Sequence, residues 1–98
     1  MTKLNVLRGQ VLKLLSEVYP DGINQTSLLG VYHDYNRVDD IIQATQYLVD
    51  KEYVERKETP HPYKSSEKVV YFKILPAGID LIEGNVEQDS GILIPKEA

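Results

Sequence analysis

The sequence predicts a single α+β domain: a three-helix core, a two- to three-stranded β-ribbon and a short last helix. Three observations predict it. Apolar residues recur at helical spacing over residues 3–18. Two predicted strands, residues 53–58 and the β-rich residues 69–75, flank a loop that contains two prolines. Pro76 then stands where a proline commonly opens a helix, here over residues 77–83.

Length and composition limit the class of protein. A chain of 98 residues makes one domain that buries roughly 65% of its unfolded surface. It contains no Cys, which excludes disulfides and zinc–thiolate sites. The N-terminal residues lack the apolar block of a signal peptide, and no apolar run is long enough to span a bilayer. We therefore expect a cytoplasmic protein with no membrane contact.

Charge is distributed unevenly along the chain. Residues 1–75 hold ten cations and ten carboxylates, and residues 76–98 hold one cation and five carboxylates, which accounts for the net charge of −4. The sequence thus predicts a domain over residues 1–84 and an acidic tail over residues 85–98. The tail carries an apolar triplet, Ile92, Leu93 and Ile94, which we expect to pack back on the domain or to meet a partner.

The first two helices have clear patterns. The first has apolar residues on one side and charged residues between them. After a turn over residues 19–22, Ile23 indicates a short excursion toward a strand. Asn24 is placed to cap a second helix whose buried stripe is Leu28, Leu29 and Tyr32.

The third predicted helix covers residues 36–51. Asn36 is expected to cap it, with Asp39 in the reciprocal capping position. Helical spacing groups one set as core: Val38, Ile41, Ile42, Thr45, Leu48 and Val49. The opposite set is the exposed surface of this helix: Asn36, Asp40, Gln43, Tyr47 and Asp50.

Residues 47–57 read YLVDKEYVERK, similar to the pattern LxxKGYVxRxx, and residues 71–78 read YFKILPAG, similar to VxLTPxG. In these two motifs the chain resembles the winged helix-turn-helix domains of bacterial transcriptional regulators of the MarR or PadR type. The resemblance implies a DNA-binding regulator in which two strands form the wing. Glu52 replaces the family's left-handed Gly and Leu75 replaces its capping Thr, at a cost of about 1 kcal/mol each.

That resemblance, together with side-chain chemistry, predicts two groups of DNA contacts. Amide side chains can pair with adenine, and Lys or Arg can neutralise phosphates. On the recognition helix the candidates are Asn36, Arg37, Asp40, Gln43 and Tyr47. On the wing they are Arg56, Lys57, Tyr63, Lys64 and Lys68.

Protein docking by the same fold is the alternative. Tyrosines are favoured at interfaces, and four of them (Tyr35, Tyr47, Tyr53 and Tyr63), with Ile92, Leu93 and Ile94, could bind a protein or a second copy of the chain. DNA binding predicts a continuous positive face and affinity that falls steeply with salt. Docking predicts an apolar patch and indifference to salt.

The sequence offers little evidence for catalysis or metal binding. The two histidines, His33 and His61, lie in predicted loops, and no Ser has the context of a nucleophile. There is no Gly-rich phosphate-binding motif. We expect no enzyme, no catalytic residue, no metal ligand and no cofactor.

Overall fold

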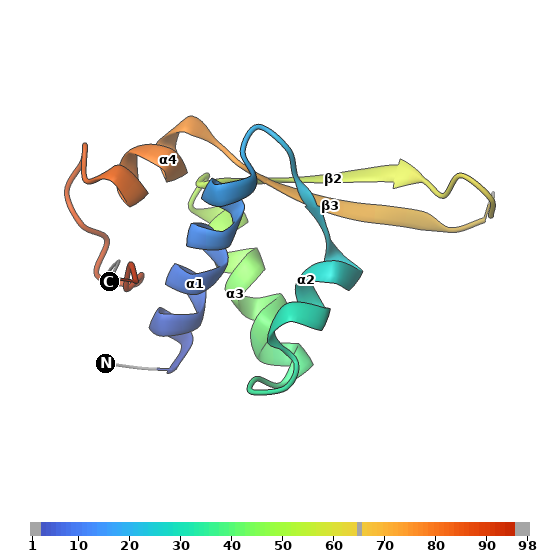
Figure 1. Ribbon diagram of the computed structural model, residues 1–98, viewed down its shortest axis with the longest axis horizontal. Coiled ribbons are helices and arrows are strands. Elements are labelled where there is room, and N and C mark those ends of the chain that lie inside the picture. Colours follow the sequence, from blue (N-terminus) through green and yellow to red (C-terminus); the bar gives the residue numbers. More distant parts are fainter. Residues whose placement is uncertain (1–2, 65, 96–98) are drawn as a thin grey trace.

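The computed structural model describes residues 3–64 and 66–95, which form an α+β fold. These residues contain four helices and one three-stranded antiparallel sheet (Figure 1), in agreement with the three-helix core, two- to three-stranded ribbon and last helix that the sequence predicts. The helices are α1 (Lys3–Val18), α2 (Gln25–Tyr32), α3 (Val38–Asp50) and α4 (Pro76–Glu83), and the strands are β1 (Ile23–Asn24), β2 (Val54–Pro60) and β3 (Lys68–Ile74). This order of elements is compatible with a winged helix.

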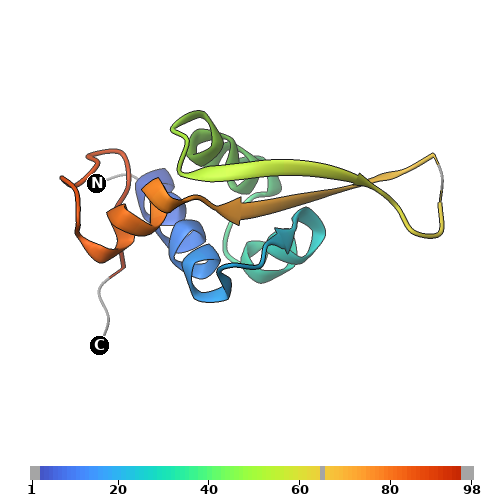
Figure 2. The same cartoon turned by 90° about the horizontal axis from the view of Figure 1, so that it is seen from above.

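The sheet has the strand order β1-β3-β2, so β3 is central. β1 contributes two residues, with Ile23 opposite Phe72. β2 pairs along its whole length, from Val54 opposite Ile74 to Pro60 opposite Lys68. We call β2, β3 and the connection between them the ribbon. It projects well beyond the helices (Figures 1 and 2), which gives the molecule a long axis of 43 Å.

The hydrophobic core lies where the helices meet the base of the sheet. α1 supplies four of the buried side chains and runs beside α3 (Figure 1), and α4 covers a further part of α1. The buried apolar residues are Leu7, Val11, Leu12, Leu15, Leu28, Ile41, Ala44, Leu48, Val54, Phe72, Ile74, Leu81 and Ile92. The ribbon beyond Arg56 takes almost no part in this core, so its shape depends on strand pairing.

Helix ends follow the predicted chemistry at several positions. Asn24 caps α2, since its side-chain oxygen accepts a hydrogen bond of 2.7 Å from the Ser27 N–H. Glu52 adopts a left-handed φ of 64°, the conformation for which the regulators that this sequence resembles have Gly. Leu75 precedes α4 without a side-chain cap, and Gly84 ends that helix at a φ of 78°. The structure therefore shows both expected consequences: a strained non-Gly residue at position 52 and an α4 N-terminus without a side-chain cap.

The predicted start of the third helix is wrong. α3 begins at Val38, and Arg37 occupies the capping position without a side-chain hydrogen bond. Asn36 instead donates from its side-chain amide to the Tyr32 carbonyl at 3.1 Å, so it closes the end of α2. The amide is used one helix earlier because the carbonyls that end α2 need donors too.

The predicted core of α3 is also partly wrong. Ile41, Ala44, Thr45 and Leu48 are buried, whereas Val38 and Ile42 are 48% and 40% exposed. The buried residues have the spacing i, i+3, i+4 and i+7 of a single stripe, with Ala44 at its second position. Val38 and Ile42 lie at the edge of this stripe, so counting them as core turns the predicted face around the helix, whereas Val49 is partly buried against the core as predicted.

The chain after α4 returns to the helices. Ile92 is buried against the core at 6% exposure, and the Leu93 N–H donates to the Asn5 carbonyl at 3.0 Å. Gly9 makes this approach possible, because a Cβ there would overlap the backbone carbonyl of Leu93. The expectation that the apolar triplet packs back is confirmed for Ile92. We call the contact between α1 and residues 89–94 the seam.

Across residues 3–64 and 66–95, no helix has both the length and the apolar character needed to cross a membrane.

Candidate nucleic-acid interface

The exposed side of α3 carries few of the predicted recognition residues. Gln43 is exposed, and neither it nor Arg37 makes a side-chain hydrogen bond or ion pair with another described residue. Asp40 is half-buried, and Asn36 is held in the turn by its bond to Tyr32. Arg37 and Gln43 are therefore exposed and without a side-chain partner among the described residues.

Tyr47 is turned away from the surface that would face DNA. Its ring lies under the Arg8 guanidinium, 3.7 Å from the ring centre, and its hydroxyl lies beside Gly91. Arg8 is fixed in turn by bonds to the Asn5 side chain at 3.2 Å and to the Gly91 carbonyl at 3.1 Å. The prediction that Tyr47 is free on the recognition face is wrong, because the returning chain and α1 cover that side of α3.

Gln46, which is not among the predicted recognition residues, lies on the exposed side of α3. Its amide donates to Asp50 at 2.8 Å, a typical pair four residues apart. α3 contains Asp39, Asp40 and Asp50 and neither Lys nor Arg, so the helix carries a charge of −3. Such a helix repels phosphates.

One face of the ribbon lies on the side of the helices, and the other faces away from them. Side chains alternate along a strand, and residues directly opposite each other point to the same side. Arg56 is opposite the buried Phe72 and Lys68 is opposite Pro60, which places both cations on the inner face, toward the helices. Lys57, opposite Tyr71, and Lys73 lie on the outer face.

Each predicted basic residue of the ribbon lies near a carboxylate. Arg56 pairs with Glu58 at 2.9 Å and Lys68 approaches the same carboxylate at 3.8 Å. Lys57 lies 3.5 Å from Glu55, and Lys64 lies 3.9 Å from Glu67. These are exposed pairs, worth at most about 1 kcal/mol each, so a phosphate could replace the carboxylate at small cost.

The tip of the ribbon presents Tyr63, which is 92% exposed. Its backbone N–H donates to the His61 ring at 3.1 Å, and His61 in turn donates its backbone N–H to the Glu67 carbonyl at 3.0 Å. These bonds shape the tip so that Tyr63 and Lys64 are both exposed. An exposed aromatic ring beside a cation suits contact with a nucleic acid or with a protein.

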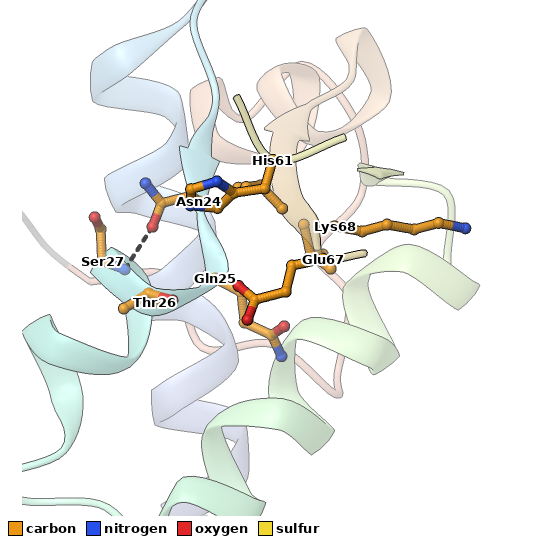
Figure 3. A pocket seen from close by; sticks show the side chains of 9 residues that line it. Asn24, Gln25, Thr26, Ser27, His61, Glu67 and Lys68 are labelled. Atoms are coloured by element: carbon orange, nitrogen blue, oxygen red, sulfur yellow. Dashed lines mark hydrogen bonds between the residues drawn. The ribbon is translucent and has the colours of Figure 1, made fainter. Parts of the chain in front are cut away.

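A polar hollow of about 450 Å³ lies between the start of α2 and the ribbon (Figure 3). Residues 24–27 form one wall, and His61, Glu67 and Lys68 form the other. The Glu67 carboxylate points toward α2, whereas the Lys68 side chain leads away from the hollow (Figure 3). With that carboxylate inside it, the hollow does not form an anion site.

The histidines are not assembled with other reactive groups. His33 lies 3.4 Å from Asp34 at the surface, and His61 accepts the bond from Tyr63. In the part of the chain that the structure describes, no three His, Asp or Glu side chains gather as metal ligands would.

Asp89 forms a small polar cluster at the seam. Its side chain is 9% exposed and accepts bonds from the Tyr53 hydroxyl at 2.9 Å, the Gly91 N–H at 2.8 Å and Lys51 at 3.1 Å. Burial alone would raise the pKa of Asp89, but the bonds from Gly91, Lys51 and Tyr53 outweigh it and lower that pKa. Of the four tyrosines expected to form an interface, Tyr53 and Tyr47 are therefore occupied inside the molecule, and Tyr35 and Tyr63 are exposed.

Comparison of the chain with protein-family models, with curated proteins and with solved structures finds no match.

Proposed function

We propose that this chain is a winged helix-turn-helix domain that binds duplex DNA and acts as a small transcriptional regulator, with the ribbon as its main grip on the phosphates. One observation carries the proposal. The ribbon projects from the body and holds five cations against three carboxylates over residues 54–74, a charge of +2 within a chain of net −4. The remaining residues therefore carry −6, and phosphates are attracted to the ribbon.

Within the ribbon, the inner face is the better side for DNA. Arg56 and Lys68 lie there on the side of the helices, so a duplex held by them could also meet α3. Lys64 and Tyr63 at the tip extend the contact along the backbone. Contacts near α3 would be limited to Gln43 and to Arg37 at its N-cap, because the three carboxylates of α3 oppose close approach to phosphate.

A titration of random-sequence duplex at several salt concentrations tests the proposal. Each phosphate that is neutralised changes the slope of log affinity against log salt by about −0.9. Arg56→Gln with Lys68→Gln should therefore lower the steepness of that slope by roughly 2 and weaken binding across all sequences. Lys57→Gln with Lys73→Gln removes the same charge from the outer face and should leave the slope almost unchanged.

Two results would refute the proposal. One is the absence of duplex binding by the unmodified chain at low salt. The other is an equal effect of the inner and outer pairs of substitutions, since affinity would then follow net charge and not the inner face.

Protein docking without DNA is the second candidate function. It is favoured by the apolar side chains that α3 exposes, Val38 and Ile42. Under this candidate the duplex titration shows no binding at any salt concentration.

A further inference from the structure

Exposed apolar side chains are concentrated at the helix-turn-helix. Nine large apolar side chains of the described residues are exposed, and four of them fall within the twelve residues 31–42. Val31 is 54% exposed, Tyr35 86%, Val38 48% and Ile42 40%. We call these four residues the turn patch. Single exposed apolar residues are ordinary, whereas large contiguous apolar patches mark binding surfaces.

The four residues lie in the α2–α3 connection and in the helix turns on either side of it. Val31 stands in the last turn of α2, and Tyr35 is in the connection that follows. Val38 and Ile42 are four residues apart in α3 and so lie on the same side of that helix. Tyr35 and Val38 line one shallow hollow together with Asp34. The connection between α2 and α3 lies well away from the ribbon tip (Figures 1 and 2).

The surroundings of the turn patch are acidic. Residues 31–42 contain Asp34, Asp39 and Asp40 against Arg37, a charge of −2, and the rest of α3 adds Asp50. Asp34 and Asp39 are exposed. A ligand that covers Val38 and Ile42 must therefore bring apolar groups to the centre and tolerate carboxylates at the edge.

From this charge complementarity we propose that the turn patch docks a protein segment whose apolar side chains are flanked by Lys or Arg. A phosphate backbone would be repelled by the same carboxylates. A symmetric dimer through the patch would bring the aspartates of two copies together, which disfavours a second copy as the occupant. The proposal does not depend on DNA binding, because the cations assigned to DNA lie on the ribbon.

A synthetic peptide supplies the probe. We would use a helical peptide of Leu and Lys (about 18 residues, or five turns) and a matched peptide with Glu in place of Lys. Binding is followed by two-dimensional NMR of the ¹⁵N-labelled chain. The Leu–Lys peptide should shift the amide signals of residues 31–42 and leave those of the ribbon in place. The Leu–Glu peptide should bind at least about 10-fold more weakly, since like charges oppose it.

Matched variants distinguish binding at the turn patch from nonspecific hydrophobic binding elsewhere on the surface. Val38→Ser with Ile42→Ser should weaken binding of the Leu–Lys peptide about 10-fold or more, through lost apolar burial. Val86→Ser is the control, because Val86 is 50% exposed, close to the 48% of Val38, but lies outside the patch. Asp34→Asn with Asp39→Asn should weaken binding several-fold and reduce its dependence on salt. Arg56→Gln with Lys68→Gln should have no effect, so failure of the DNA proposal leaves this result unchanged.

Three results would overturn the proposal. The first is equal binding of the Leu–Glu peptide. The second is a set of shifted signals centred outside residues 31–42, or an equal effect of Val86→Ser. The third is a mass in analytical ultracentrifugation that doubles with concentration in the unmodified chain and does not in the Val38→Ser, Ile42→Ser variant, because a second copy would then be the occupant.

Discussion

Replacing Gly9 by Ala should destabilise this protein, although the same change favours a helix. Gly9 lies within α1, where Ala is better than Gly by about 1 kcal/mol. The added Cβ, however, would overlap the backbone carbonyl of Leu93, and backbone cannot turn aside as a flexible side chain can. The seam must then open or α1 must shift.

The expected size follows from what the seam holds. Opening it exposes Ile92, which is 6% exposed, and burial of such a side chain is worth about 1.5–3 kcal/mol. The bonds to Asp89 and Arg8 would be lost too, partly offset by the freedom that residues 89–94 regain. After the helical gain of about 1 kcal/mol, we expect a net loss of about 1–2 kcal/mol in the free energy of unfolding. The melting temperature should fall by roughly 5–15 °C.

Urea unfolding followed by circular dichroism measures this loss. Gly30→Ala is the matched control: Gly30 is in α2 with nothing within 4 Å of the added Cβ, so this change should stabilise by up to about 1 kcal/mol. In a chain that ends at Gln88, Gly9→Ala should become stabilising, because its obstacle is gone. A full-length Gly9→Ala protein as stable as the unmodified chain, with the NMR signals of Ile92 and Leu93 unchanged, would refute the reasoning.

Three further predictions concern single side chains. The lowered pKa of Asp89 means that its carboxylate stabilises the fold above the unfolded pKa of about 3.9, and that this stability is lost as the pH falls through the lower folded value. Asp89→Asn should remove this part of the acid dependence in urea titrations at pH 2–6, and an unchanged pH profile would contradict it. Burial, with a smaller effect of Glu17, raises the pKa of Tyr32 to about 12. Stability should therefore fall as the pH rises from about 10 toward that value, and Tyr32→Phe should remove the last step of the ultraviolet tyrosine titration. Glu52→Gly should stabilise by about 1 kcal/mol, because it relieves a side chain held at a φ of 64°; a loss of thermal stability would show that the Glu52 side chain matters more.

Local patterns predicted most of the fold. The helical spacing of α1, the Asn24 cap, the β-rich composition of β3 and the Pro76 helix start depend on neighbouring residues, and all four are present. The start of α3 was wrong because Asn36 can cap α3 or close α2, and both choices satisfy the same local rule. In the folded chain, the Asn36 side chain closes α2.

The candidate site was harder to predict, because it depends on distant parts of the chain. Nothing near Tyr47 in sequence indicates that Arg8 and Gly91 cover it, and these residues come from opposite ends of the chain. The sequence does contain an indication that Val38 and Ile42 are exposed. Ala44 completes a stripe with Ile41, Thr45 and Leu48, and including this small residue in the core would have turned the predicted face to the observed one. The pairing of each ribbon cation with a carboxylate needed the strand register.

The seam also has a consequence for how the chain folds. The bond between Asn5 and Leu93 closes a loop of 88 residues (93 − 5), whereas Pro60 and Lys68, which pair near the ribbon tip, are eight residues apart (68 − 60). Closing the longer loop has the larger entropic cost, so the ribbon can form early and the seam forms after the helices are in place. Shortening Ile92 to Ala should accordingly hasten unfolding and leave the rate of refolding almost unaltered, as expected of contacts absent from the transition state.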